Sequence, residues 1–374
     1  SDGGLDTRFD RVSARVSAPL RLLGLGVVAA GDALLDDTAL PVLRSAGRDR
    51  NAGLSFGWRA ENRMLGYLKL APIEGPRRYA AQVLASRTVR RPYDPAWSLD
   101  GWSGFDGLGL PVFSPTPLPG YVRYRAADHK AITDERRLAT LLSASGTRGS
   151  RRGTVTLGWL RTRSATTVGG GHAIPGAPQV AAFDTDFSGD PFHVIGGDDP
   201  LYRVSGSDMV SLRGDAEIET RGGAAIRLGL GTSYEEVWLD ELDATLLYVA
   251  GNPIDSVRAY RAHAPGGFAY AQGRWQSGGL VLNAGLRAEY FTAGPQAEHQ
   301  TLPGSAAGRL SLLPRLGLAY PLSARDVFSM SYTRSSQTPA RDLLYDRRLA
   351  ITNRQPLGNP ALRPARLISL KPRP

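Results

Sequence analysis

The sequence contains a hydrolase-like serine motif, but the residues around it do not support catalysis. GLSFG at Gly53–Gly57 matches the G-x-S-x-G pattern of hydrolases. In those enzymes the serine sits on a sharp turn from a strand into a helix. Ser55 instead lies in a segment where Leu54, Phe56 and Trp58 alternate with other residues, as in a strand. We therefore expect no nucleophile at Ser55 and no enzymatic activity.

Metal-ligating residue types are also present, and one segment resembles a calcium loop. DTDFSGD carries oxygen ligands at Asp184, Asp186, Ser188 and Asp190, but Ile195 stands where the bidentate glutamate of such a loop belongs. A polar loop stabilised by aspartate turns is the alternative interpretation. The sequence contains no cysteine, which excludes disulfides and thiolate metal sites, and we expect no bound metal or cofactor. The five histidines are dispersed without zinc-site spacing: His129, His172, His193, His263 and His299.

The elements that must position these residues are strands, as the segment Gly278–Phe291 demonstrates. Alternate side chains of a strand point to opposite faces. One face of this segment is apolar, and strands of about ten residues with this pattern are typical of an outer-membrane β-barrel. In a soluble sandwich the same face would be core. The apolar row is Leu280, Leu282, Ala284, Leu286, Ala288 and Tyr290, and the opposite row is Val281, Asn283, Gly285, Arg287 and Glu289.

The pattern recurs along the chain, with short links alternating with long ones. Short periplasmic turns and long extracellular loops distinguish the two sides of an outer-membrane barrel. Pro72, Gly75 and Pro76 lie either within one very long strand or in a tight connection between two strands. Two strands would break the alternation of short and long links before the segment Arg90–Gly120. One expected strand begins near Asp208. The others are Ala224–Tyr234, Phe268–Trp275, Gly279–Phe291, Leu310–Tyr320 and Val327–Ser335, with two more around Leu54–Trp58 and Val155–Trp159. Irregular segments are expected at Arg90–Gly120, Val168–Ser207 and Gln337–Asn359, and a long polar segment follows Tyr234 and reaches Gly267.

Charged side chains on the polar rows are the candidate binding residues. They are predicted to face the lumen, where they line a substrate path, hydrate the lumen or contact a plug. These candidates are Arg213, Glu217, Glu219, Arg287 and Glu289.

Composition narrows the class of protein. The 374 residues are 42% hydrophobic with a mean hydropathy of −0.23, which suits a barrel because only half of each strand must be apolar. The most apolar stretch, Leu22–Leu35, contains glycines and Asp32 and is too short for a transmembrane helix. The net charge of +10 comes mostly from scattered arginines, so we expect no nucleic-acid binding.

The C-terminal third resembles a known family. Three segments carry the resemblance, in the family's order and spacing: FAYAQGRWQSGGLVLNAGLRAEYF at Phe268–Phe291, LLPRLGLAYPLSARDVFSMSYTRSSQTPARDLLY at Leu312–Tyr345, and GNPALRP at Gly358–Pro364. They resemble the barrel of TonB-dependent outer-membrane receptors. Gly273 and Ala365 depart from it, because the family has Asp and Glu there. PYDPAWSLDGW at Pro92–Trp102 also resembles a loop of the receptors that carry an N-terminal carboxypeptidase-regulatory-like module.

The resemblance implies energised import of a siderophore, a glycan or a peptide. In that family a plug fills the barrel and the TonB complex pulls it aside. We expect residues 1–374 to be an all-β, antiparallel transmembrane section of a 22-stranded barrel in contact with outer-membrane lipid. The plug and the C-terminal strands are expected to be absent from it. The alternatives are a porin-like or adhesive barrel without energy coupling and a soluble all-β carbohydrate-active protein.

Overall fold

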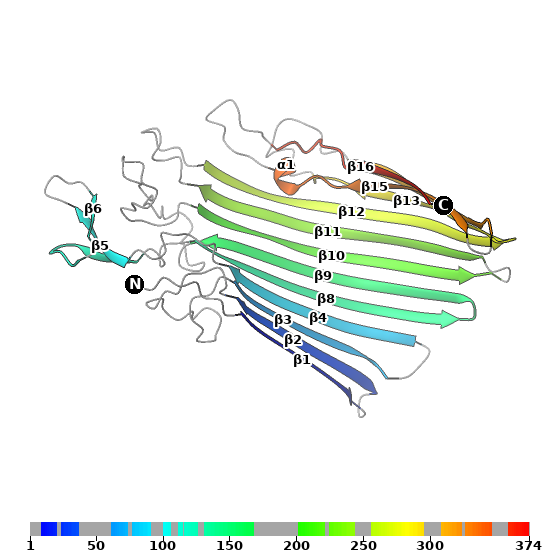
Figure 1. The fold of residues 1–374 in the computed structure, drawn as a ribbon, viewed down its shortest axis with the longest axis horizontal. Helices are drawn as coiled ribbons and strands as arrows, with labels where there is room; N and C mark the ends of the chain where they lie inside the picture. The colour runs from blue at the N-terminus through cyan, green and yellow to red at the C-terminus, as the bar shows by residue number, and fades with distance from the viewer. Residues whose placement is uncertain are drawn as a thin grey trace.

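The chain forms one large antiparallel sheet and a second, small one (Figure 1). The computed structural model describes residues 9–20, 24–36, 61–73, 77–90, 100–105, 111–114, 116–125, 131–167, 201–220, 224–243, 256–294, 308–323, 326–345 and 358–373. The strands of the large sheet are β1 (Phe9–Leu20), β2 (Leu25–Asp36), β3 (Glu61–Pro72), β4 (Arg77–Arg90), β8 (Ile132–Arg148), β9 (Arg151–Thr167), β10 (Leu201–Glu219), β11 (Ala225–Asp243), β12 (Ser256–Ser277), β13 (Leu280–Phe291), β14 (Arg309–Pro321), β15 (Val327–Gln337) and β16 (Ala365–Arg373).

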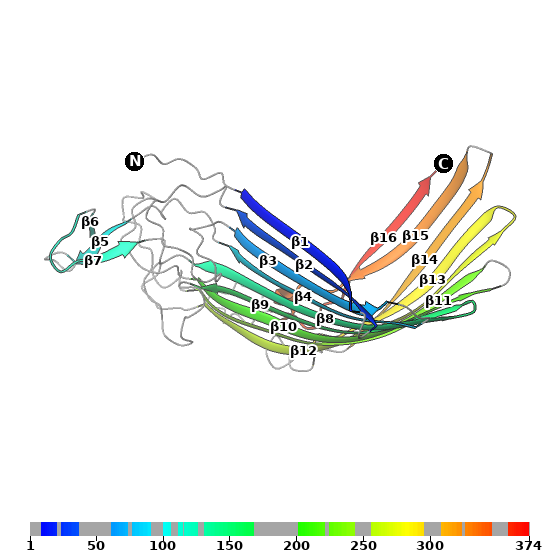
Figure 2. The ribbon, with the colours of Figure 1, turned by 90° about the horizontal axis from the view of Figure 1, so that it is seen from below.

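The large sheet has a meander topology. Its 13 strands follow one another in chain order, and every neighbouring pair is antiparallel. The sheet bends into an open trough, with β1 and β16 at its two edges (Figure 2). This is the arrangement of a barrel section, and it confirms the predicted all-β fold.

The register gives the sheet two chemically different faces. Leu212 on β10 is opposite Thr232 of β11, and Leu286 on β13 is opposite Pro314 of β14, so the side-chain rows of single strands join into continuous faces. We call the apolar face the outer face. It leaves large apolar side chains accessible, including Val83, Leu142, Leu157, Leu212, Leu228, Leu230, Leu286, Leu312 and Leu316. The opposite, inner face carries Arg213, Arg287 and Glu289. A face this apolar and this exposed is suited to contact with lipid.

Aromatic residues border the outer face at both ends. Tyr290 is exposed near the long-loop end of β13, and Trp275, the register partner of Leu282, is exposed near the short turns. The eight residue steps from Leu282 to Tyr290 correspond to about 26 Å of strand. Tyr79 and Tyr320 join Trp275 in the aromatic row near the short turns. Trp159 and Tyr234 join Tyr290 in the row nearer the long loops. These rows match the interfacial girdles of membrane barrels.

Short and long connections alternate without exception along the described sheet. Gly149, Gly278 and Gly279 have positive φ angles of 59°, 57° and 83° in two of the short turns. β3 and β4 are separate strands, so the prediction that two strands would break the alternation was wrong. It failed because β1 and β2 were not expected to precede them. β2 is nearly continuously apolar and therefore lacks a clear period of two.

Several strands extend further toward the long loops than expected. β10 already begins at Leu201, which shortens the irregular segment predicted at Val168–Ser207. β11 continues to Asp243 and β12 begins at Ser256, so these strands occupy much of the polar segment expected between Tyr234 and Gly267. The extensions were missed because their outer rows do not continue the apolar pattern without interruption. Asp208, Glu236 and Arg261 interrupt the outer rows of β10, β11 and β12. Only about 9 to 11 residues of a strand cross the hydrocarbon, and the remainder needs no apolar face.

The segment Arg90–Gly120 is not wholly irregular, which corrects another prediction. Within and just after it, the small sheet forms from β5 (Asp100–Phe105), β6 (Pro111–Ser114) and β7 (Val122–Arg125), in the order β6-β5-β7. Each strand is short and contains a β-branched or aromatic residue, which favours pairing.

The described residues contain a single helix, α1 (Arg341–Tyr345), in the connection between β15 and β16. No helix in the described ranges is long and apolar enough to cross a membrane. The expected strand at Leu54–Trp58 and the calcium-loop candidate Asp184, Asp186, Ser188 and Asp190 lie outside the described residues.

The two faces predict unequal tolerance to charge on β13. Leu286 is 50% exposed on the outer face, whereas Asn283 lies on the inner face. In a lipid-reconstituted receptor, Leu286→Arg is expected to lower the free energy of unfolding by about 2 to 4 kcal/mol if position 286 is near the midplane. Asn283→Arg is expected to cost far less. Urea titrations measure both, and equal losses would show that the faces are wrongly assigned.

Candidate functional site

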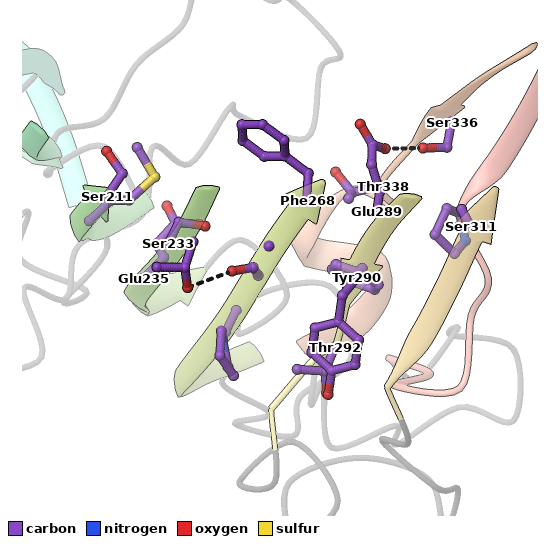
Figure 3. A pocket seen from close by; sticks show the side chains of 18 of the residues that line it. Ser211, Ser233, Glu235, Phe268, Glu289, Tyr290, Thr292, Ser311, Ser336 and Thr338 are labelled. Atoms are coloured by element: carbon purple, nitrogen blue, oxygen red, sulfur yellow. Dashed lines mark hydrogen bonds between the residues drawn. The ribbon is translucent and has the colours of Figure 1, made fainter. Parts of the chain in front are cut away.

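The inner face has a pocket at the end of the sheet that carries the long loops. Its volume is 660 Å³. Strands β10 to β15 supply one side, and the segment from Thr338 to Tyr345, which includes α1, supplies the other. Figure 3 shows side chains of neighbouring strands around this space. Those that matter below are Ser211, Arg213, Ser233, Glu235, Phe268, Arg287, Glu289, Ser311, Ser336 and Arg341.

The pocket contains three of the five predicted lumen-facing residues. Arg213, Arg287 and Glu289 line it. Glu217 lies closer to the short turns, where its Oε1 accepts hydrogen bonds from Arg227 Nε and Nη2 at 3.0 and 2.8 Å. Glu219 ends β10 beside the turn. All five residues share the inner face, and the folded-back segment decides which part of that face forms a pocket, while their role in binding stays a prediction.

Every arginine that lines the pocket is paired with a carboxylate. Arg213 Nε donates to Asp215 at 2.6 Å, and Arg287 Nε donates to Glu289 at 2.6 Å. Arg341 of α1 forms an ion pair with Glu235 of β11. The pocket is therefore close to electrically neutral, although it is rich in charge.

Hydroxyl groups supply the remaining polar surface. Ser336 donates to Glu289 Oε2 (Figure 3), while Ser211, Ser233 and Ser311 line the pocket from β10, β11 and β14. A hydroxyl both donates and accepts hydrogen bonds. The pocket can therefore bind a ligand with uncharged polar groups without breaking its own ion pairs.

Phe268 lies between two guanidinium groups. The Arg287 guanidinium is 3.9 Å from the ring centroid and that of Arg213 is 5.8 Å away, both suitable for cation–π attraction. The ring lies over the backbone of β11 because Gly231 is opposite it. A Cβ atom at Gly231 would come within 2.6 Å of the ring. The glycine thus permits the close approach that holds Phe268 in place.

An apolar cluster fixes α1 against the inner face. Leu344 and Tyr345 are almost fully buried against Val237 and Leu239 of β11 and Tyr260 of β12. The Tyr345 hydroxyl donates to the carbonyl of Ala293 at 2.8 Å. Burial raises the pKa of Tyr345 to about 12. The hydroxyl therefore remains protonated and keeps donating this hydrogen bond.

The GNPALRP motif completes this side of the pocket. Asn359 N–H donates to the carbonyl of Leu343 at 2.8 Å, and Asn359 Oδ1 accepts from Ala361 N–H at 2.9 Å. Leu362 packs against the cluster that holds α1. Two motifs that carried the family resemblance are thus structural neighbours.

The residues that the sequence reasoning missed are Glu235, Phe268, Ser311, Ser336 and Arg341. They lie on five different elements, and only pairing brings them together. The motif QTPARDLLY was an available signal, since its Arg341, Leu344 and Tyr345 make the contacts described above. Within the described ranges, no group of three or more His, Asp or Glu residues is placed to hold a metal ion.

Tyr345→Phe is expected to destabilise the packing of α1. It leaves the buried carbonyl of Ala293 without its donor, at a cost of about 1 to 3 kcal/mol at pH 8. The pKa of Tyr345 is raised from 10.0 to about 12, so the native protein keeps this contribution below pH 10 and loses it between pH 10 and 12. The difference between native protein and variant should shrink over that interval in denaturant titrations.

Tyr320→Phe is the control for that measurement. Tyr320 is exposed on the outer face, so its substitution should change stability little at either pH. Equal effects of the two substitutions at pH 8 would contradict the role given to Tyr345.

Comparison with known proteins identifies the family. The family described as TonB dependent receptor-like, beta-barrel, matches residues 72–370. No curated protein matches the chain.

Solved structures share the fold at low sequence identity. The ferric enterobactin receptor PfeA of Pseudomonas aeruginosa, in complex with BCV-L6, is 15% identical with a TM-score of 0.51 over 92% of this chain and 44% of its own. The FrpB iron transporter of Neisseria meningitidis is 13% identical with a TM-score of 0.51 over 89% of this chain and 45% of its own. The siderophore receptor PiuA of Acinetobacter baumannii is 10% identical with a TM-score of 0.52 over 98% of this chain and 52% of its own.

This chain thus spans about half the length of the receptors it resembles. The family match covers most of the chain, and the strand order, the two faces and the aromatic rows agree with it. The chain belongs to the TonB-dependent receptor β-barrel family, whose members are transport receptors of the bacterial outer membrane and not enzymes.

Proposed function

We propose that this chain forms part of the barrel of a receptor that binds a substrate on the extracellular side and takes it up with energy from the TonB complex. The observation that carries the proposal is the inner-face pocket beside Phe268, at the end of the sheet with the long loops. In outer-membrane barrels the long loops are extracellular. A substrate entering from outside would meet this pocket early.

The open edges of the sheet support a proposal for the domain arrangement. Residues 1–374 are proposed to be barrel region, with the plug and further strands supplied by a longer protein. β1 and β16 would each expose a row of unpaired backbone groups to hydrocarbon, at several kcal/mol per group. Further strands between these edges would remove that cost. The TonB complex would act through the plug.

The chemistry of the pocket favours a substrate that bears uncharged polar groups. Arg213, Arg287 and Arg341 already have carboxylate partners, so an anionic ligand would have to compete for them. A glycan or a peptide backbone needs only hydrogen bonds to the hydroxyls and stacking on Phe268. A siderophore is the third candidate, because PiuA is described as a siderophore receptor and PfeA as a ferric enterobactin receptor. The uncharged polar groups of the siderophore would then form the hydrogen bonds to the pocket hydroxyls.

Glu235→Gln in the full-length receptor tests the pocket. It weakens the ion pair that ties α1 to β11, and we expect substrate binding to outer-membrane vesicles to fall about tenfold. Glu61→Gln is the matched control, because Glu61 also forms an inner-face ion pair, with Arg90 at 3.3 Å, but lies outside the pocket. The assay compares labelled siderophores, oligosaccharides and peptides. Equal losses of substrate binding for both variants would show that the pocket is not part of the binding site.

Uptake in cells with and without the TonB complex tests the energy coupling. Accumulation of substrate inside the cell should require the TonB complex, whereas binding of substrate to the receptor should not. Uptake that persists unchanged without it would favour the alternative of an uncoupled barrel.

Refolding of residues 1–374 alone tests the proposed domain arrangement. The open edges should make the chain aggregate or remain an open sheet in detergent or lipid, because unpaired strand edges are not tolerated in hydrocarbon. A heat-modifiable, protease-resistant monomer with stable single-channel conductance would show instead that these strands close by themselves.

A further inference from the structure

The outer face changes from apolar to cationic on three neighbouring strands. On β4 the outer row reads Tyr79, Ala81, Val83 and Ala85, and then Arg87. On β8, Arg136 follows Leu138 toward the long loops, and on β9, Arg161 and Arg163 follow Trp159. The register places Arg87 opposite Arg136 and Arg136 opposite Arg163. All four arginines therefore form one group on the face that contacts lipid.

The position of this group corresponds to the headgroup level of the outer leaflet. An arginine at the bilayer midplane costs about 2 to 4 kcal/mol, and the cost almost vanishes at the interface. Trp159, a residue type typical of the interface, directly precedes the arginines, and the Arg161 guanidinium lies 5.2 Å from its ring. Arg163 is similarly 5.4 Å from the ring of Trp238. The arginines begin where the apolar band ends.

The group carries more positive than negative charge. Asp134 accepts hydrogen bonds from both Arg87 and Arg136, with shortest distances of 2.9 and 2.8 Å. Asp208 is shared in the same way by Arg161 at 2.7 Å and Arg163 at 2.6 Å. Among the ion pairs of the described residues, these four arginines share two aspartates, which leaves a surplus of two positive charges. The neighbouring Glu236 does not cancel it, because Arg261 lies 3.7 Å away.

Two of the arginines have side-chain nitrogens that donate no hydrogen bond to these carboxylates. Among the described residues, Arg161 donates a side-chain hydrogen bond through Nε alone, and Arg136 through Nε and Nη2. Their side chains are 48% and 63% exposed. Guanidinium groups with unused N–H donors bind phosphate oxygens in a bidentate manner.

A groove of 510 Å³ lies among these side chains. Arg87, Arg136, Arg161 and Arg163 line it together with Met64 and Leu138. We call it the arginine groove. Its cationic rim suits a phosphate, and its apolar part suits the adjoining hydrocarbon of the same molecule.

We propose that the arginine groove binds the phosphorylated headgroup of a glycolipid in the outer leaflet. Surplus charge, unused donors and the location at the edge of the apolar band together favour a lipid phosphate over a soluble anion. The site lies on the opposite face of the sheet from the pocket beside Phe268 and does not depend on the proposed uptake function.

The test removes the surplus charge and leaves both aspartates paired. Arg136→Gln combined with Arg161→Gln keeps the Arg87–Asp134 and Arg163–Asp208 ion pairs. Arg11→Gln with Arg227→Gln removes the same charge from the inner face, where these residues pair singly with Asp32 and Glu217. The full-length receptor is purified in neutral detergent and titrated with bisphosphorylated lipid A, and bound lipid is counted by native mass spectrometry.

The native receptor and the inner-face control should bind lipid A alike, and the outer-face double variant about tenfold more weakly. Lipid A without its phosphates should bind the native receptor as weakly as phosphorylated lipid binds the outer-face variant. Equal binding by all three proteins, or no dependence on the phosphates, would overturn the proposal. Displacement of lipid A by equimolar inorganic phosphate would also overturn it, since the groove would then be a site for free anions.

Discussion

The need to satisfy every backbone hydrogen bond without water determines this structure. In hydrocarbon, N–H and C=O groups must pair within the protein, and a sheet achieves this only through its neighbouring strands. The antiparallel meander meets the requirement with turns of a few residues. Once the ladder is fixed, side chains can project only to its two faces. The apolar outer face and the polar inner face are therefore consequences of the same pairing.

The inner face acquires its specific features where the chain folds back onto it. The ladder alone would leave a row of polar side chains in an open trough. α1 and the GNPALRP motif bring Leu344, Tyr345 and Leu362 against β11 and β12, and this apolar contact holds Arg341 beside Glu235. A small hydrophobic cluster on an otherwise polar surface thus creates the pocket. The outer face has its own chemical boundary, where the apolar rows give way to arginines that are shared by Asp134 and Asp208.

The sequence predicted the fold well because an apolar outer face requires an apolar residue at every second position of each strand. Strands β13 to β15 were predicted almost to their ends. The reasoning failed where that requirement is absent. β2 carries apolar residues on both faces, with Asp32 and Asp36 as its charged members, and Asp208, Glu236 and Arg261 interrupt the outer rows of β10, β11 and β12. The short strands β5 to β7 are too brief for a period to show. Arg213, Arg287 and Glu289 were found because they share a parity with their neighbours. Phe268, Ser336 and Arg341 became site residues only through register and fold-back, which local patterns do not encode.

Accessibility measurements along β13 test the central claim most directly. The chain contains no cysteine, so each single cysteine introduced into this section provides one labelling site there. Nitroxide labels at positions 282 to 290 of the full-length receptor in lipid vesicles report collision rates with oxygen, which concentrates in hydrocarbon, and with a water-soluble nickel complex. Positions 282, 284, 286 and 288 should favour oxygen, and positions 283, 285, 287 and 289 should not. Accessibility that varies smoothly along β13, or an alternation with the opposite parity, would contradict the assignment of the two faces.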